Sequence, residues 1–296
     1  MKKRITAGNV LVNVFFVLIS ITFIVPFMYV VAVSFTSEAD VARYGYNLIP
    51  KHFSLDAYRY VFANPSQVIQ AYKVTAIFSA GGTFLSVLVM ALTAYPLSKA
   101  NFKYKKIITF YIFFTMIFSG GLIPSYILNT KYLHLNNKIW VYILPSLAGG
   151  FQIIMIRTFF QQLPGSLAES AKIDGASELK IFFRIMLPLS TPVIATVSFM
   201  ILIGKWNDWN TSLLYINDER LYSLQYLLQK ILREAEFVKA MVRDMPSAAG
   251  MINSTELPSE SMKFALAVVV SGPMLVIFPF FQKYFAGGLT IGSVKG

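Results

Sequence analysis

Long apolar runs alternate with polar connections along most of the chain. A helix needs about 20 apolar residues to cross the hydrocarbon core of a bilayer, and each of the long runs meets this length. The predicted spans cover residues 10–33, 74–98, 107–128, 139–160, 193–214 and 262–281. This pattern predicts an all-α, polytopic membrane protein with six transmembrane helices, which forms a single domain over residues 1–296. An even number of spans places both chain ends on the same side of the membrane.

The composition is that of a membrane protein rather than a soluble domain. Of the 296 residues, 56% are hydrophobic and 14% are charged, whereas soluble domains carry about 25% charged residues. The first apolar run, residues 10–33, exceeds the apolar core of about 7–15 residues in a signal peptide, so we expect it to be a retained span. The chain contains no cysteine, which excludes disulfides, zinc–thiolate sites and thiol nucleophiles.

The distribution of charge predicts the orientation in the bilayer. A net charge of +12 would favour a nucleic-acid partner in a soluble protein, but here it fits anchoring in a membrane, and we expect no nucleic acid. The connections on each side hold thirteen Lys and Arg, yet the side of the termini has three acids against eleven on the other. Its short connections are also denser in basic residues. The positive-inside rule therefore places both termini and residues 161–188 in the cytoplasm, and residues 215–261 outside.

The polar segment 161–188 combines features of a helix and of a turn. Pro164 can open a helix, because its missing N–H is not needed in the first turn. Gly175 interrupts the helical pattern at a cost of about 1 kcal/mol relative to Ala, which indicates a bend or a close contact. From these residues alone, an ordinary solvated connector between membrane helices is an equal alternative to a docking helix.

The spacing within this segment resembles a known motif. Glu169-Ser170-Ala171 is followed after two residues by Asp174-Gly175-Ala176, and then by Phe183, Ile185 and Leu187-Pro188. This order is similar to the EAA loop of ABC importer permeases, with Ser170 in place of the middle Ala. The resemblance implies that the segment is a coupling helix that docks on an ATPase subunit. The implied contact residues are Glu169, Ser170, Ala171, Asp174, Gly175 and Ala176.

Further stretches resemble the same family. Tyr95-Pro96-Leu97-Ser98-Lys99 looks like the end of its second conserved span, and Trp206-Asn207-Asp208-Trp209 looks like a patch in its fifth. The segment from Tyr284 to Gly296 is similar to the tail of the maltose-permease second subunit, which reaches between the ATPases, so Lys295 and Gly296 are the implied tail contacts. The chain is thus similar to the maltose-permease second-subunit (MalG-like) family, near the lipoprotein-associated oligosaccharide permeases.

This resemblance implies a function in transport. It implies a permease subunit of an ATP-driven importer in the bacterial cytoplasmic membrane, which moves oligosaccharides by alternating access. The implied partners are a second permease in a heterodimer, two ATPase subunits that hold ATP and Mg, and an extracytoplasmic solute-binding protein. In such permeases the loop corresponding to 215–261 contacts the binding protein. Residues 221–242 of that loop have an amphipathic helical pattern, although an ordinary surface loop is the alternative.

We expect no catalytic residues and no cofactor in this chain. No G-x-x-x-x-G-K-[ST] motif occurs, so nucleotide must be bound by another chain. His52 and His134 have no third ligand at metal spacing, and no metal site is expected. A secondary transporter or channel that works alone is the alternative function. It predicts intramembrane acids and an inverted repeat, but the spans contain almost no acid apart from Asp208.

A polar cluster near the outer end of the fifth span is a candidate for the substrate pathway. It comprises Lys205, Trp206, Asn207, Asp208 and Trp209. Lys205 and Asp208 are three residues apart, so on one helix they can form an ion pair. Intramembrane charges usually face a bundle interior or a water-filled cavity. The alternative is an interfacial aromatic belt with a snorkelling lysine. Whether the transported oligosaccharide is acidic or neutral stays open, with Lys205 as a candidate partner for a carboxylate.

Overall fold

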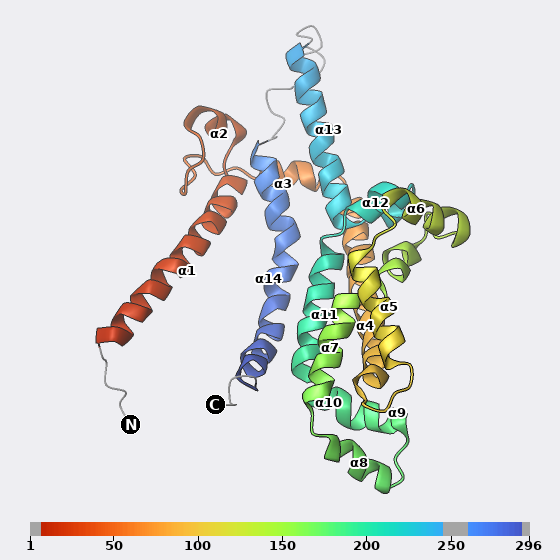
Figure 1. Ribbon diagram of the computed structural model, residues 1–296. Helices are drawn as coiled ribbons and strands as arrows, with labels where there is room; N and C mark the ends of the chain where they lie inside the picture. The colour runs from red at the N-terminus through yellow and green to blue at the C-terminus, as the bar shows by residue number, and fades with distance from the viewer. Residues whose placement is uncertain (1–6, 245–259, 292–296) are drawn as a thin grey trace. The chain divides into compact units, whose positions relative to one another are not determined.

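The computed structural model describes residues 7–244 and 260–291, and these residues form helices and turns with one isolated β-bridge between Thr36 and Phe53 (Figure 1). The all-α architecture predicted from the hydropathy pattern is confirmed. The chain divides into two compact units, which are described separately. One unit comprises residues 1–65 and 228–273, and the other comprises residues 66–227 and 274–296.

The first unit begins with a long apolar helix. Helix α1 (Ala7–Ser34) covers the predicted span 10–33, and its side chains are exposed along nearly the whole length. A helix that is apolar all round and has no cover of its own is suited to a lipid environment or to contact with another apolar helix. Two short helices follow, α2 (Glu38–Tyr44) and α3 (Asp56–Val61).

Within this unit, Glu38 caps the start of helix α14 (Glu260–Ile291). Its carboxylate accepts hydrogen bonds from the backbone N–H groups of Glu260, at 3.1 Å, and Ser261, at 3.0 Å. Burial alone would raise the pKa of Glu38, but these bonds and the contact with Lys239 lower it. Since the first N–H groups of a helix lack partners within the helix, the Glu38 carboxylate stabilises the beginning of α14.

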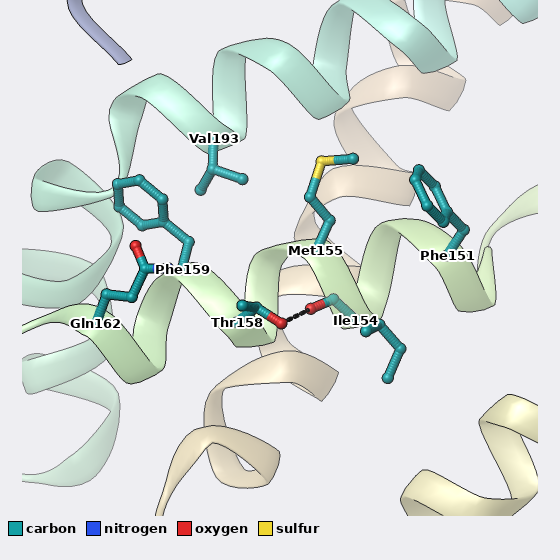
Figure 2. Close-up of a pocket in the computed structure, with 7 residues that line it drawn as sticks. All are labelled: Phe151, Ile154, Met155, Thr158, Phe159, Gln162 and Val193. Atoms are coloured by element: carbon teal, nitrogen blue, oxygen red, sulfur yellow. Dashed lines mark hydrogen bonds between the residues drawn. The ribbon is translucent and has the colours of Figure 1, made fainter. Parts of the chain in front are cut away.

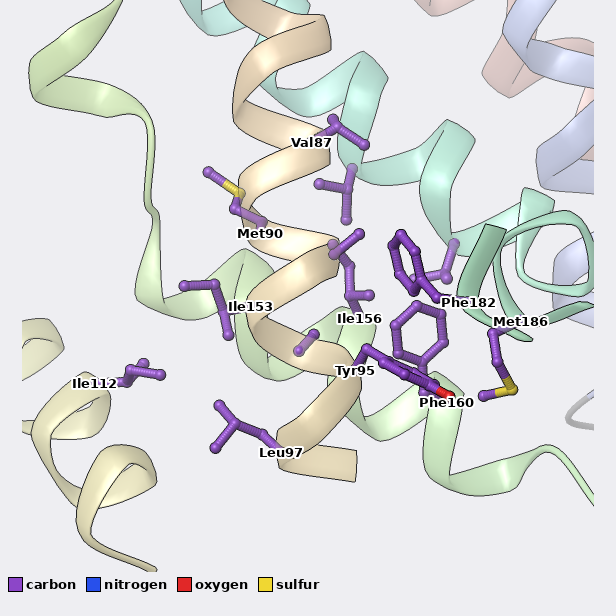
Figure 3. Packing of buried hydrophobic residues seen from close by; sticks show 14 of the residues in the cluster. Val87, Met90, Tyr95, Leu97, Ile112, Ile153, Ile156, Phe160, Phe182 and Met186 are labelled. Carbon is purple, nitrogen blue, oxygen red and sulfur yellow. The ribbon is translucent and has the colours of Figure 1, made fainter. Parts of the chain in front are cut away.

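The second unit is organised around α4 (Pro65–Ser98), which covers the predicted span 74–98 and begins nine residues earlier. Helices α5 (Lys105–Ile117), α7 (Gly150–Gln162) and α11 (Thr191–Trp206) lie beside it (Figure 1). Their shared core is a cluster of buried apolar residues (Figure 3), centred on Tyr95, Phe160 and Phe182. The rings of Tyr95 and Phe182 are 5.3 Å apart, and those of Tyr95 and Phe160 are 6.3 Å apart.

Three of the predicted spans are interrupted in the structure. Among the described residues, α1, α4 and α14 are each long and apolar enough to cross a membrane alone. The remaining candidates are pairs of shorter helices with a sharp bend between them. Helix α5 is followed by α6 (Leu122–Ile127) and the π-helix η1 (Leu128–Tyr132) at 113°, after Gly121 with φ of +87°. Glycine is the residue that adopts this backbone conformation without steric cost.

The other two interruptions have proline or glycine at the break. The 3₁₀ turns η2 (Ile139–Tyr142) and η3 (Leu144–Ser146) precede α7 at an angle of 52°. Helix α9 (Glu178–Ile181), the π-helix η4 (Phe182–Met186) and α10 (Leu187–Leu189) precede α11 at 81°. The predicted span 193–214 also ends early, because α11 stops at Trp206 and α12 (Asn210–Tyr215) begins after a turn.

The predicted loops contain helices of their own. Residues 161–188 hold α8 (Gly165–Ile173) together with α9, η4 and most of α10, and in Figure 1 these elements lie at one end of the helices of the second unit. Residues 215–261 contain the short 3₁₀ turn η5 (Glu219–Leu221) and α13 (Leu224–Asp244), which covers most of the predicted amphipathic helix. Residues 245–259 lie outside the described part of the chain.

Candidate coupling helix and substrate pathway

Helix α8 begins and ends where the sequence predicts. Pro164 precedes its first residue, and Gly175 follows its last turn with φ of +76°. The N–H of Ala176 donates to the carbonyl of Ala171 at 2.9 Å, and the N–H of Gly175 donates to that of Lys172 at 3.0 Å. This is the hydrogen-bonding pattern of a glycine helix terminus. A side chain at Gly175 would meet open space within 4 Å, so the glycine serves the bend and not a close contact.

The two faces of α8 have different environments. Glu169 and Ser170 are exposed, as are Asp174 and Gly175 in the following turn. Ala171 and Ala176, together with Ala168, pack partly against the core cluster. The small residues therefore attach the segment to its own subunit, and Ser170, Asp174 and Gly175 stay exposed.

Large apolar side chains are exposed on the same segment. Ile173, the last residue of α8, is 87% exposed, Leu167 is 41% exposed, and Leu179 of α9 is 63% exposed. Together with Glu169 and Asp174 they form a mixed apolar and polar surface. Interfaces between subunits commonly combine an apolar centre with a polar rim.

Glu178 joins α8 to the end of α4. One oxygen of its carboxylate accepts a hydrogen bond from Lys172 of α8 at 2.7 Å. The other accepts bonds from the Tyr95 hydroxyl at 2.8 Å and from the Lys99 ammonium. The hydrogen bonds from Lys172 and Lys99 lower the pKa of Glu178 to about 2, so this carboxylate stays ionised throughout the neutral pH range. The motif spacing gave no indication of this cluster, because Lys99 and Tyr95 are far away in sequence.

A half-open cavity of about 400 Å³ lies between α8 and the end of α4. Its lining includes Tyr95 and Lys99 on one side and Gly165, Glu169 and Lys172 on the other. The N-terminal part of α8 is therefore not packed tightly against α4. The segment is attached to its unit by the alanines, which pack on the core cluster, and by the hydrogen bonds of Glu178.

The predicted polar cluster of residues 205–209 is only partly brought together. Lys205 is buried, with 6% of its surface exposed. Its ammonium donates to the carbonyl of Tyr142 at 3.0 Å and to the hydroxyl of Ser146 at 2.6 Å. The predicted ion pair with Asp208 is not present within the described part of the chain. The pair does not form because α11 ends at Trp206. Lys205 and Asp208 are therefore not on one helix, and a spacing of three residues does not bring them together.

Asp208 has a different role. Its carboxylate accepts a hydrogen bond from the N–H of Thr211 at 3.0 Å, in the first turn of α12. A carboxylate at this position satisfies a backbone donor that has no partner within the helix. Asp208 therefore stabilises the turn between α11 and α12.

Lys205 lies directly against the backbone of α4. A Cβ atom on Gly82 would be 2.9 Å from the Cε atom of Lys205, which is closer than such contacts allow. Gly82, Tyr142 and Ser146 are thus parts of the lysine site that the sequence analysis missed. No local pattern identifies them, because all three are brought to Lys205 by long-range packing.

The aromatic and amide residues differ in exposure. Trp206 is buried, and its ring lies 6.4 Å from that of Tyr72. Trp209 is half-buried, whereas Asn207 is exposed and its side-chain oxygen accepts a hydrogen bond from Gln225 at 2.9 Å. Of the predicted cluster, Asn207 is therefore exposed and Trp209 is half-buried, whereas Lys205 and Trp206 are buried.

A second cavity, of about 370 Å³, lies along α7 and Val193 of α11 (Figure 2). Phe151, Ile154, Met155 and Phe159 give it an apolar lining, and the hydroxyl of Thr158 donates within the helix to Ile154 at 2.8 Å. A sugar needs several hydrogen-bonding partners, and this lining does not supply them.

Two other predictions concern metals and the tail. In residues 7–244 and 260–291, no group of three His, Cys, Asp or Glu side chains is placed to hold a metal ion. Lys295 and Gly296, the predicted tail contacts, lie outside the described residues.

Comparison with known proteins gives full-length relatives, although no family model matches the chain. It is 41% identical over 274 residues to the protein LplC of Bacillus subtilis, covering 92% of this chain and 90% of that protein. It is 38% identical to the polygalacturonan/rhamnogalacturonan transport system permease protein YtcP of the same organism, over 100% of both chains. Among solved structures, a chain of a bacterial ABC transporter involved in the import of the acidic polysaccharide alginate matches with a TM-score of 0.77 and 26% identity, over 94% of this chain and 96% of that one.

The fold, the exposed α8 with its motif and these full-length matches define the class: the chain is a permease subunit of an ABC importer. Within that class, it belongs to the MalG-like family of carbohydrate-uptake permeases. This membership supersedes the alternative of a secondary transporter or channel that works alone.

Proposed function

We propose that this chain imports acidic oligosaccharides across the bacterial cytoplasmic membrane, as one of two different permease subunits in a complex with two ATPase subunits and an extracytoplasmic solute-binding protein. ATP and Mg are bound by the ATPases, and this chain performs no catalysis. Residues 1–296 act as one permease domain with six spans, in which α11 belongs to the fifth span and the elements of residues 161–188 stay in the cytoplasm, and both termini are cytoplasmic.

The observation that carries this proposal is the exposed surface of α8 and the turn that follows it. Ser170, Asp174 and Gly175 are exposed, and Ile173 is 87% exposed in the same segment. Glu169 is also exposed, at the cavity between α8 and the end of α4. The alanines on the opposite face attach the segment to the core of its own unit. A short helix that is held on one face and exposes a mixed surface on the other is suited to docking in a cleft of an ATPase. Movement of the ATPases then displaces α8 and drives alternating access.

The substrate class is supported by the relatives and by the charge near the pathway. One relative is named for polygalacturonan and rhamnogalacturonan, and the structural neighbour belongs to an importer of an acidic polysaccharide. In this chain, Lys205 bonds only to neutral oxygens among its described contacts. We propose that Asn207 and Trp209 line the pathway, with Trp206 and Asp208 supporting them. Lys205 supplies a positive potential from behind, which favours a carboxylate-bearing sugar.

The tail completes the proposed contact with the ATPases. Lys295 and Gly296 belong to a glycine-containing segment that resembles the tail of the maltose-permease second subunit. We propose that this segment reaches between the ATPases.

The docking surface can be tested by site-specific crosslinking. The natural chain has no cysteine, so Ile173→Cys creates a single thiol to which a photoreactive maleimide can be attached in the assembled complex. We expect the crosslink to capture the ATPase subunit. Ile49→Cys is the matched control, because Ile49 is 82% exposed but lies between the predicted spans 10–33 and 74–98. With the N-terminus cytoplasmic, that connection is expected on the outer side.

The two variants give separate outcomes. The proposal requires an ATPase adduct from position 173 and none from position 49 in complexes with equal ATPase activity. An active complex in which position 173 forms no ATPase adduct, or in which both positions form it equally, would overturn the proposed docking surface.

A further inference from the structure

The Glu178 cluster connects the coupling segment to a transmembrane helix. Lys172 belongs to α8, Glu178 begins α9, and Tyr95 lies in the last turn of α4, with Lys99 directly after it. Both oxygens of the carboxylate are used, one toward α8 and the other toward α4. A single side chain therefore bridges an element that meets the ATPase and an element that crosses the membrane.

On the α4 side, the bridge reaches the hydrophobic core. Tyr95 is 7% exposed, and its ring packs beside Phe160 of α7 and Phe182 of η4 (Figure 3). The Lys99 ammonium also lies 4.4 Å from the centre of the Tyr95 ring. A force applied at Glu178 therefore acts on a residue that is fixed among three helical segments.

On the α8 side, few other contacts connect this helix to the end of α4. A cavity of about 400 Å³ separates much of α8 from the end of α4, and α8 contains no fully buried residue. The alanines on its inner face pack on the core, but alanine side chains are small and offer no directional bonds. Charge-assisted hydrogen bonds are stronger than neutral ones and depend on direction, so they resist sliding of one element past another.

We propose that Glu178 is a positioning residue that transmits the movement of α8 to α4. This inference rests on the proposed docking of the ATPase at α8, and it adds a residue and a route that the coupling motif does not include. When the ATPases displace α8, Lys172 moves with it, and Glu178 passes the displacement to Lys99 and Tyr95. Loss of the carboxylate leaves ATPase docking intact but lets α8 move without α4.

The ion pairs of this cluster are partly exposed, so their removal has a small effect on assembly. The side chains of Lys99, Glu178 and Lys172 are 29%, 52% and 51% exposed. Solvent screens pairs at such exposure, and they contribute little to stability. Variants of the cluster should therefore form complete complexes in which coupling can be measured.

The test compares Glu178→Gln and Lys99→Gln with Lys180→Gln in purified complexes in proteoliposomes. Lys180→Gln is the matched control, because it removes one positive charge from α9, as Lys99→Gln does from the end of α4, but none of the described contacts involves its side chain in an ion pair. The readouts are the stimulation of ATPase activity by loaded binding protein, the number of solute molecules imported per ATP, and the melting temperature of the complex.

We expect both cluster variants to lower import per ATP by about two- to fivefold, the factor that corresponds to a partly exposed ion pair. Melting temperature and complex yield should stay at the wild-type level, as should all readouts of Lys180→Gln. The double variant Glu178→Gln/Lys99→Gln should lose no more than either single variant, because residues that act through one contact are not additive.

Each contrary outcome has a distinct meaning. Wild-type import per ATP in Glu178→Gln, or a lower melting temperature with unchanged coupling, would overturn the role of Glu178 and leave the proposed function standing. A wild-type complex whose ATPase is not stimulated by the loaded binding protein would instead overturn the proposed function itself.

Discussion

At the scale of single residues, Gly175 shows how one backbone conformation defines the coupling segment. Its φ of +76° lies in the left-handed region, which costs an L-residue with a side chain about 1–2 kcal/mol. Space is not limiting there, since a Cβ atom would have no neighbour within 4 Å. The bend is therefore sensitive to conformational preference rather than to side-chain size.

This distinction predicts different effects for two substitutions of similar size. Gly175→Leu should reduce ATPase stimulation by loaded binding protein, because leucine disfavours the left-handed conformation and changes the direction in which α9 leaves α8. Gly175→Asn should retain most of the stimulation, because asparagine tolerates that conformation. Both complexes are to be compared at equal yield. Wild-type stimulation in Gly175→Leu would show that the bend is not needed for coupling.

Lys205 shows the opposite situation, a charged residue held by neutral groups in a closely packed interior. Its contacts with Tyr142 and Ser146 tie α11 to the broken segment before α7, and Gly82 leaves room for its side chain. A charge at membrane depth costs at least about 2.5 kcal/mol on insertion scales. We infer that the charge is retained for its effect on an acidic solute.

Lys205→Met should therefore depress uptake of an oligogalacturonide more than uptake of a neutral galactooligosaccharide of equal length. The measurement is the ratio of the two uptake rates within one variant. Partial misassembly lowers both rates by the same factor, so it does not change this ratio. A ratio equal to that of the wild type would mean that Lys205 has only a structural role in helix packing.

At the scale of elements, hydropathy located the apolar runs but not the breaks within them. A run such as 107–128 is apolar throughout, so its average does not reveal the turn at Gly121, where the chain bends by 113°. The polar groups freed at such breaks are satisfied from far along the sequence, as the carbonyl of Tyr142 is by Lys205. Such contacts arise from packing and cannot be derived from periodicity.

The coupling segment was predictable to a larger extent, because its signals are local. Pro164 and Gly175 mark its ends by backbone chemistry, and the motif spacing indicates its role. The direction of its faces was not predictable: Ala171 and Ala176, which the motif implies as ATPase contacts, pack partly against the core of their own unit. Lys205 and Asp208 were expected to be able to pair on one helix, but the rule for residues three apart holds only where the helix continues, and α11 ends between them.

At the scale of the whole molecule, the chain is a permease subunit of an ABC importer. Its sequence contains no G-x-x-x-x-G-K-[ST] motif, and we propose that an ATPase acts through the exposed surface of α8. The relative YtcP matches the chain from end to end, so the family membership extends over the full length. Transport should therefore depend strictly on partner subunits.

The most direct test of this account is solute uptake by proteoliposomes that contain this chain, the second permease and the ATPases, with loaded binding protein outside and ATP inside. We expect accumulation of the oligosaccharide against its gradient, and its loss when ATP is omitted or when an ATPase that cannot hydrolyse ATP is used. Accumulation by this chain alone, or uptake that continues without ATP hydrolysis, would contradict the account.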